Sequence, residues 1–340
     1  MANPHDPNPP TTTAPAWHWD SRHDFPRDVI GYGPGSHDPR WPGGAKIAVS
    51  FVVNYEEGAE LTALNGDAYS ETRLWEAAGA PPRLRQRAVN VESEYGYGAR
   101  AGVWRLLRLF ERRGLSVTLY AVGKALEDNP EVGRECVRVG HDVACHEYRW
   151  VDYHDFSPED EKAMIKRGIE AVKNVTGEYP KGWYYGRLSP RSHALVWDVF
   201  HEMGIPLLWN SDSYADDVPY WVDVPAEKDD PDPKGLLMVP YSYDCNDFKF
   251  GVATGFGAPM DFYDHVKSAF DMLYEEGCEG MPKMMTVGLH CRVAGKPARF
   301  AALKKFVEYI SSKEGVWVAT RTQIAEHFRE QFPYRKGQRV

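Results

Sequence analysis

From Lys46 onward, short apolar runs alternate with amphipathic segments along most of the chain, and this alternation constrains the fold most strongly. Repeated strand–helix alternation indicates a parallel sheet with right-handed crossovers. With about seven or eight strands, we expect a single α/β domain built as a closed or nearly closed (β/α) barrel. The apolar runs predict strands at residues 46–54, 116–121, 142–146, 182–185, 207–211, 236–242, 284–290 and 315–319.

Helical segments are expected between most of these strands. Residues 100–113 place Val103, Leu106, Leu107 and Phe110 at i, i+3, i+4 and i+7, which is one face of a helix. A second helix begins at Ser157, with a proline next and an acid three residues on, a pattern typical of a helix N-terminus. Further helices are predicted from Ser189 to Gly204 and at residues 261–276, 297–312 and 321–330.

The rest of the chain divides into tails, an arm and two long loops. Residues 1–16 are rich in Pro, Thr and Asn and predict a disordered tail. Residues 17–44 predict an irregular arm that packs on the domain or on a neighbouring subunit, residues 45–332 the catalytic domain, and residues 333–340 a C-terminal tail. Segments 58–98 and 212–235 are long, polar and aromatic, and we expect them to form walls of an active-site mouth or subunit contacts.

Charge and cysteine content narrow the possible partners. A net charge of −9 over 340 residues argues against nucleic acid or an anionic membrane as the main partner. No apolar stretch reaches the roughly 18–20 residues needed to span a bilayer, and no signal peptide is visible. Five cysteines without a Cys-x-x-Cys spacing are typical of reduced thiols. We therefore expect a cytoplasmic protein whose main partner is neither nucleic acid nor a membrane.

Polar residues follow many of the expected strands, and a barrel places its chemistry at these ends. Adjacent strand residues point to opposite faces, so Cys145 and Cys291, next to candidate histidines, are expected to face the helices. The candidates at the strand ends are Glu56, Glu57, His146, Arg149, Trp150, Tyr184, Tyr185, Arg187, Asp212, Asp216, Asp217, Asp244, Asn246, Asp247, His290 and Arg292.

Several of these segments, taken in order, resemble the metal-independent (PuuE-type) allantoinase branch of the NodB-type polysaccharide deacetylase superfamily. The resemblance runs from roughly Phe25 to Phe332. It implies a deformed (β/α) barrel, cyclic amide hydrolysis without a tightly bound metal, and a homo-oligomer, often a tetramer. The segments that carry it are Phe25–Tyr32, Asn54–Gly58, Gly140–His146, Gly182–Arg187, Asp212–Asp217 and Leu289–Arg292.

The resemblance also implies roles for single residues. Glu56 falls on the general base of the deacetylases, Glu57 on their metal-ligand aspartate and His146 on their first ligand histidine. Arg187 falls on the arginine that orients the base, Asp212 on the aspartate motif and His290 on the Leu-His motif. Glu147 departs from the allantoinase pattern, which has a small residue after this histidine.

A catalytic zinc ion usually needs three protein ligands. The deacetylases supply two of them from His-x-x-x-His, but here the second histidine is Trp150, which cannot ligate. Trp150 can instead stack on a flat ring. We therefore expect no tightly bound metal and no other cofactor, although Glu57, His146 and a distant acid could still assemble a weak zinc site.

Without metal, amide hydrolysis needs a base, an acid and donors for the developing oxyanion. We assign Glu56 as base and His290 as acid, with His146 and Arg187 stabilising charge. The residues predicted to bind substrate are Glu57, Trp150, Tyr184, Tyr185, Asp212, Asp216 and Arg292.

The preferred function is the opening of allantoin, a small ureide, to allantoate. Three alternatives remain: a cyclic-imide hydrolase using the same site, an N-deacetylase for chitin-type, peptidoglycan or other polysaccharides, and an inactive ligand-binding or scaffold protein. The missing His-x-x-x-His counts against the deacetylase, and the retained carboxylates, histidines and arginine count against the scaffold.

Overall fold

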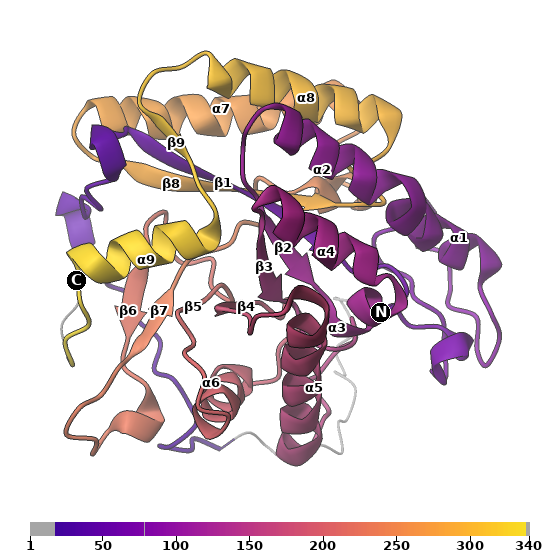
Figure 1. Cartoon of the computed structure of the whole chain (residues 1–340), viewed down its shortest axis with the longest axis horizontal. Helices are drawn as coiled ribbons and strands as arrows, with labels where there is room; N and C mark the ends of the chain where they lie inside the picture. The colour runs from indigo at the N-terminus through magenta and orange to yellow at the C-terminus, as the bar shows by residue number, and fades with distance from the viewer. Residues whose placement is uncertain (1–17, 78, 338–340) are drawn as a thin grey trace, which may run out of the picture.

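The protein is described as a computed structural model that covers residues 18–77 and 79–337, so the predicted tail at residues 1–16 lies outside it. A single curled sheet dominates the fold, in the strand order β6-β7-β5-β4-β3-β2-β1-β8, with β9 beside the first residues of β1 (Figure 1). All neighbouring strands are parallel except β6 and β7. The predicted fold class, a deformed α/β barrel, is confirmed.

The strands are β1 Ile47–Tyr55, β2 Thr118–Ala121, β3 Asp142–Cys145, β4 Gly182–Trp183, β5 Trp209–Asn210, β6 Tyr220–Val222, β7 Leu236–Met238, β8 Lys283–His290 and β9 Val316–Val318. The α-helices are α1 Val89–Tyr97, α2 Val103–Arg112, α3 Gly123–Asp128, α4 Pro130–Val139, α5 Pro158–Thr176, α6 Ser192–Glu202, α7 Pro259–Cys278, α8 Pro297–Ser311 and α9 Arg321–Gln331. A π-helical turn, Gly98–Gly102, joins α1 to α2, and 3-10 turns lie at Gly33–Gly35, Pro42–Gly44, Ala63–Asn65, Pro225–Glu227 and Asp247–Gly251.

The sequence-based assignment did not include β6 or the helices α1, α3 and α4. Helix α1 lies inside the segment 58–98, which was expected to be a loop, and buries only Val91 and Tyr95. A helix with so few apolar positions gives a weak periodic signal. Helix α4 does carry the usual boundary signals, a proline in its first turn and Gly140 with positive φ at its end.

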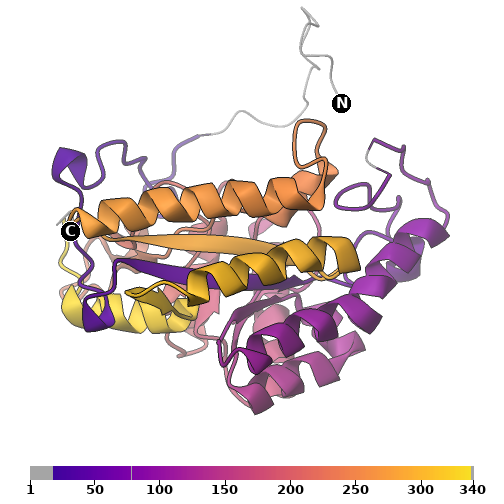
Figure 2. The same cartoon turned by 90° about the horizontal axis from the view of Figure 1, so that it is seen from above.

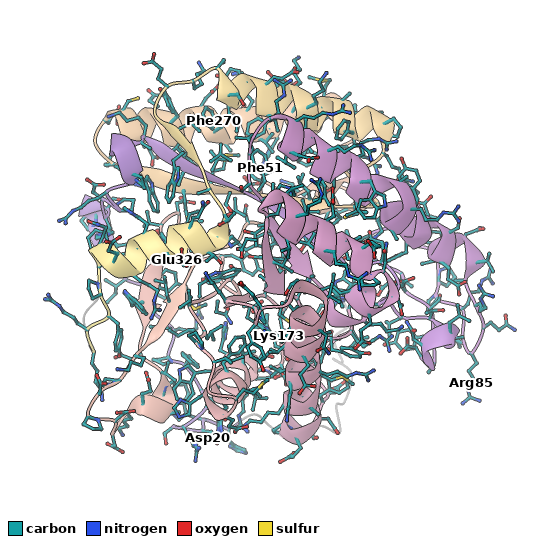
Figure 3. The ribbon with its side chains drawn as sticks, in the orientation of Figure 1. Asp20, Phe51, Arg85, Lys173, Phe270 and Glu326 are labelled. Atoms are coloured by element: carbon teal, nitrogen blue, oxygen red, sulfur yellow. The ribbon has the colours of Figure 1, made fainter. Side chains whose placement is uncertain are left out.

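Alternation along the strands divides the core into two layers. In β1, Ala48 and Val52 face the barrel interior and pack with residues such as Trp209 and Leu237. The odd-numbered residues of the same strand face the helices, where Phe51 packs against phenylalanines of α2 and α8 (Figure 3). Helices α7 and α8 lie along β8 and β1 on this outer face (Figure 2).

The carboxyl-terminal helix α9 crosses the inside of the curl between β1 and the β5–β7 edge (Figure 1). Its first residue, Arg321, is fully buried and donates to Ser211 Oγ, Thr286 Oγ1 and the carbonyl of Pro240. A buried guanidinium with several acceptors links strands that would otherwise be separate. This helix closes the end of the barrel at which the parallel strands begin, and leaves the opposite end for the site.

The amino-terminal arm packs on this domain. Trp41 donates from its indole nitrogen to the carbonyl of Lys283 at 2.9 Å, and the Tyr32 hydroxyl donates to the carbonyl of Pro219. Among the residues that the structure describes, no helix is both long and apolar enough to cross a membrane.

Candidate active site

A cavity of about 350 Å³ opens at the carboxyl ends of the strands. This size suits a small molecule. Six of the predicted site residues line it: Glu56, His146, Trp150, Tyr184, Arg187 and His290. The strand-end candidate Asn246 also lines it, and the other lining residues are Asn54, Thr72, Arg73, Leu74, Gly186, Tyr241, Tyr243, Phe248, Gly251 and Val252.

Strand alternation explains which neighbour of each pair reaches the cavity. Glu56 continues the inward set of β1, whereas Glu57 continues the outward set. In the same way Tyr184 lines the cavity, while Tyr185 packs behind the sheet against Tyr153 and Trp183. Cys145 and Cys291 are buried among the residues facing the helices, as expected.

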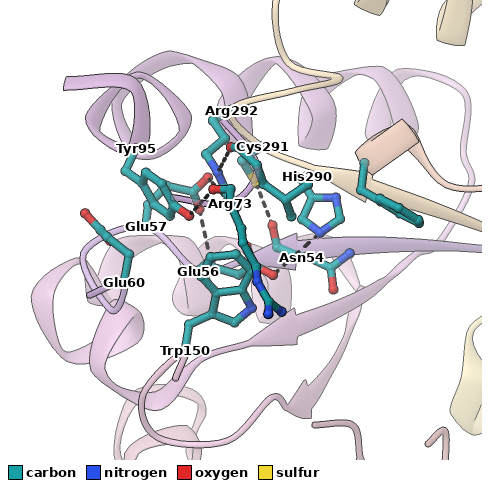
Figure 4. A network of polar contacts seen from close by, with 12 residues as sticks. Asn54, Glu56, Glu57, Glu60, Arg73, Tyr95, Trp150, His290, Cys291 and Arg292 are labelled. Atoms are coloured by element: carbon teal, nitrogen blue, oxygen red, sulfur yellow. Dashed lines mark hydrogen bonds and ion pairs between the residues drawn. The ribbon is translucent and has the colours of Figure 1, made fainter. Parts of the chain in front are cut away.

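Glu56 is the hub of the site. One of its carboxylate oxygens, Oε1, lies 3.4 Å from Nε2 of His146 and 3.6 Å from Nε2 of His290. The other oxygen, Oε2, lies 2.7 Å from the guanidinium of Arg292 (Figure 4). Burial raises the pKa of this carboxyl, but the charges of Arg292, His290 and His146 outweigh burial and hold the pKa well below its usual value. Glu56 is therefore ionised at neutral pH.

The two histidines differ in charge because their neighbours differ. Burial would lower the pKa of His290, but the carboxylates of Glu56 and Asp247 raise it above its usual value. For His146, burial dominates and lowers the pKa despite Glu56. The surroundings thus favour the protonated form of His290 and the neutral form of His146.

Asp247 fixes His290 in place. Its Oδ1 lies 2.6 Å from His290 Nδ1, and its Oδ2 accepts from the backbone N–H groups of His290 and Ala294 at 2.8 and 2.9 Å. Because Nδ1 is engaged, Nε2 is left to face Glu56 and the cavity. Asp247 stood among the strand-end residues in the sequence, but nothing there distinguished it from Asp244.

The two arginines occupy places other than those expected. The resemblance placed Arg187 at the arginine that orients the base, although our mechanism had it stabilise charge, and Arg292 was predicted to bind substrate. In the structure Arg292 is fully buried behind the cavity and pairs with Glu56 and, at 3.4 Å, with Glu57. Arg187 lines the cavity and pairs with Glu71 at 3.3 Å. The geometry therefore gives Arg292 the orienting position and leaves Arg187 facing substrate.

Trp150 forms a flat wall of the cavity. The guanidinium carbon of Arg187 lies 3.8 Å from the centre of a Trp150 ring, within the range of a cation–π contact. Tyr95 packs on Trp150 at 6.0 Å between ring centres. The indole ring is thereby held in one orientation at the cavity wall, with the guanidinium of Arg187 over its face.

Glu57 lies outside the cavity, contrary to the predicted contact with substrate. Its Oε2 accepts from the backbone N–H of Glu56, and its Oε1 faces Arg292. A Cβ atom at Gly98 would lie 2.2 Å from Glu57 Oε1, so a glycine is needed where the π-helical turn meets this carboxylate. Glu57 thus supports the position of Arg292.

Asp212 and Asp216 also lie apart from the cavity around Glu56. Both carboxylate oxygens of Asp212 accept backbone N–H bonds from Tyr185 and Gly186, so this residue shapes the loop that carries Arg187. Asp216 lines a separate cavity of about 690 Å³ beneath the amino-terminal arm, beside Tyr32. The geometry gives neither carboxylate direct access to a ligand on Glu56.

Arg73 and Glu71 are site residues that the sequence reasoning did not single out. Both come from the aromatic loop 58–98, which was expected to form a wall of the mouth. The Arg73 side chain is exposed and lines the cavity, and its guanidinium has no hydrogen-bond or ion-pair partner among the described residues. Figure 4 shows it reaching over Trp150. Without strand or helix periodicity, the loop sequence gave no sign of which side chain would turn inward.

The residues of the cavity do not fit a deacetylase-type metal. Trp150 stands at the second histidine position, and Glu57, at the ligand-aspartate position, lies outside the cavity and pairs with Arg292 at 3.4 Å. Within the described part of the chain, three potential ligands converge only at Asp244, Cys245 and His265, outside the cavity. The ammonium group of Lys249 lies 3.1 Å from Asp244 Oδ1, and its positive charge disfavours a metal cation at this place.

Glu60, at the start of the same loop, provides a prediction on stability. It is buried, and burial raises its pKa to about 7. Because the pKa of Glu60 is higher in the folded than in the unfolded state, its protonated carboxyl contributes to folding stability. This contribution is fully present below pH 4.5 and is lost as the pH rises to about 7. The loss amounts to about 3 kcal/mol. In E60Q we expect the free energy of unfolding to fall less across this range, as measured by urea titration at several pH values. A constant difference between E60Q and the parent protein at every pH would contradict this.

Comparisons with known proteins agree with this architecture. The family profile described as polysaccharide deacetylase matches residues 85–207. A protein of Schizosaccharomyces pombe whose name places it among the polysaccharide deacetylases is 46% identical over 300 residues, covering 87% of this chain and 94% of that protein.

Two solved structures are similarly close. The crystal structure of Puue allantoinase is 44% identical with a TM-score of 0.85, covering 92% of this chain and all of that one. A probable polysaccharide deacetylase from Pseudomonas aeruginosa PAO1 is also 44% identical, with a TM-score of 0.84 and the same coverage.

Proposed function

Since this chain belongs to the polysaccharide deacetylase family and is structurally similar to its allantoinase branch, we propose that it opens the cyclic amide of a small ureide, most simply allantoin to allantoate, without a bound metal. Whatever its substrate, the protein is a hydrolase of the deacetylase superfamily. The observation that carries the proposal is the exchange of metal-site chemistry for an Arg292–Glu56–His290 cluster beside a flat Trp150 wall.

The proposed reaction begins with the ring in the cavity, beside Trp150 and Arg187. Glu56 takes a proton from water, and the water oxygen attacks the ring carbonyl carbon. Neutral His146 and Arg187 lie on the cavity wall, where their N–H groups can stabilise the oxyanion. As the carbon–nitrogen bond breaks, protonated His290 gives its Nε2 proton to the leaving nitrogen. The product carboxylic acid loses its proton to solvent, and the proton held by Glu56 passes to His290 Nε2, 3.6 Å away, which restores both groups. The cavity volume of about 350 Å³ also favours a small ring over a polymer.

A substrate panel tests the proposal. We expect purified protein to convert allantoin to allantoate, identified by NMR, and to leave N-acetylglucosamine oligomers unchanged. Turnover of cyclic imides alone would replace allantoin with the second substrate of the same site. Deacetylation of the oligomers would support the N-deacetylase, and inactivity on all three would favour the ligand-binding or scaffold alternative. Cytoplasmic location and a homotetramer stay predictions.

Arg73 allows a prediction on product binding. Ring opening converts a neutral ring to a carboxylate, and Arg73 is a cation on the cavity wall that has no ion-pair partner among the residues that the structure describes. A charge-assisted contact of this kind is worth about 1.5–3 kcal/mol. In R73A we expect inhibition by allantoate to weaken by at least about tenfold, with a smaller change in KM for neutral allantoin. R83A, on the same loop but off the cavity, is the control. Equal product inhibition in R73A and the parent protein would contradict the assignment.

A further inference from the structure

Glu147 is a costly residue that the proposed reaction does not use. Its side chain is about 1% exposed, and neither carboxylate oxygen has a hydrogen-bond partner among the described residues. Its backbone has φ 55°, in the left-handed region that residues other than glycine rarely adopt. Burying a polar group without a partner and holding strained backbone both destabilise a fold. Such a residue calls for a role that offsets the cost.

His146 offers the missing partner. Its Nε2 faces Glu56, while its Nδ1 is buried and has no hydrogen-bond partner in the described part of the chain. Glu147 Oε1 lies 3.9 Å from this Nδ1, so a small shift of either side chain would bring them into hydrogen-bond distance. Two unsatisfied buried groups therefore face each other directly behind the site.

We propose that Glu147 is a positioning residue, which fixes the tautomer and ring orientation of His146 through Nδ1. With a carboxylic acid O–H donated to Nδ1, the ring proton resides on Nε2, where it points at Glu56 and the cavity. An orienting partner on the second nitrogen commonly fixes a histidine in this way. The inference rests on the proposed function only in placing His146 in the reacting site.

The charge state of Glu147 is consistent with a donor. Burial raises the pKa of its carboxyl well above the usual value, which favours the protonated acid. Arg187 opposes this effect, and Glu56, Asp212 and Glu161 add to it. Burial likewise keeps His146 neutral, so that one ring nitrogen is free to accept.

The decisive variant is E147G. Glycine adopts φ 55° without strain and removes the buried carboxyl, so we expect E147G to raise the Tm. We also expect kcat for allantoin to fall by about tenfold with little change in KM, a size typical of losing a partner that orients a histidine. In ¹⁵N NMR, His146 should change from the single Nε2–H tautomer to a mixture. A residue with a merely structural role would not produce a more stable but slower enzyme.

Three further variants separate positioning from packing. E147Q keeps an N–H donor and should retain the tautomer and most of kcat. E147L keeps a side chain of similar size without a donor, and should lose both the single His146 tautomer and most of kcat. It thereby shows whether the effects of E147G come from the lost carboxyl or from altered packing. R85G relieves the same positive φ at an exposed position far from the site (Figure 3), and should raise the Tm with kcat and the His146 spectrum unchanged.

An unchanged His146 tautomer in both E147G and E147L would overturn the proposal, whatever the activity. A fall in the Tm of E147G would overturn the claim that Glu147 is held at a cost. Because the spectrum is recorded without substrate, a tautomer change in a protein that leaves allantoin intact would support this inference while rejecting the proposed function.

Discussion

Replacing Glu56 with glutamine is expected to lower kcat for allantoin by about 10³-fold, the contribution typical of a positioned general base. Glutamine keeps the shape of the side chain but cannot take a proton from water. The carboxylate lies within 3.6 Å of both histidines on the cavity side, so no other ionised carboxylate is as well placed among the described cavity residues. Steady-state kinetics with circular dichroism, to confirm folding, would measure the effect.

The matched control is E57Q. Glu57 is the adjacent residue of the same type, but it faces away from the cavity toward Arg292. We expect E57Q to retain most of the activity. Near-normal turnover in E56Q would remove Glu56 from the mechanism, and equal losses in both variants would mean that the inward and outward assignments of this pair are wrong.

Removal of Arg292 should have the largest effect on stability. Arg292 is buried and pairs with Glu56 at 2.7 Å and with Glu57 at 3.4 Å. In R292M the carboxylates of Glu56 and Glu57 would stay buried without a positive partner. Leaving a buried charge uncompensated typically costs about 3–5 kcal/mol of stability. We expect the free energy of unfolding at pH 7 to fall by that amount, as measured by urea denaturation.

The pH dependence of this loss provides the internal check. Without Arg292, the guanidinium no longer lowers the pKa of Glu56, and burial raises it. The loss of unfolding free energy in R292M should therefore shrink as the pH falls and the carboxyl groups become protonated. R138M, which breaks an exposed pair with Glu135, should leave stability nearly unchanged. A cost in R292M as small as that in R138M would contradict the assigned pairing.

The fold and half of the site followed from local patterns in the sequence. Alternation of period two places Ala48, Val52 and Glu56 on one face of β1, and the same rule correctly turned Cys145 and Cys291 toward the helices. Applied to the pair Glu56 and Glu57, it would also have separated the residue in the cavity from the one behind it. The strand-end rule in turn brought His146 and His290 to the same end of the barrel as Glu56.

The remainder depended on contacts between distant segments. Arg292 reaches Glu56 across 236 positions of the chain, and Arg187 meets Glu71 from a loop without periodicity. A pattern within one segment cannot say which arginine a carboxylate will meet, so the orienting position went to Arg187 by resemblance and Arg292 was predicted to bind substrate. Glu147 was noticed in the sequence only as a departure from a family pattern, and its burial and backbone strain became visible in three dimensions.

The most direct test of the central claim is the rate of allantoin hydrolysis by protein stripped with a strong chelator, measured before and after zinc is added. The account predicts fast conversion to allantoate in the stripped protein, with metal content far below one ion per chain and no gain from zinc, because Arg292 and the two histidines surround Glu56 where a metal would otherwise act. Activity that disappears with the metal and returns in proportion to added zinc would contradict it.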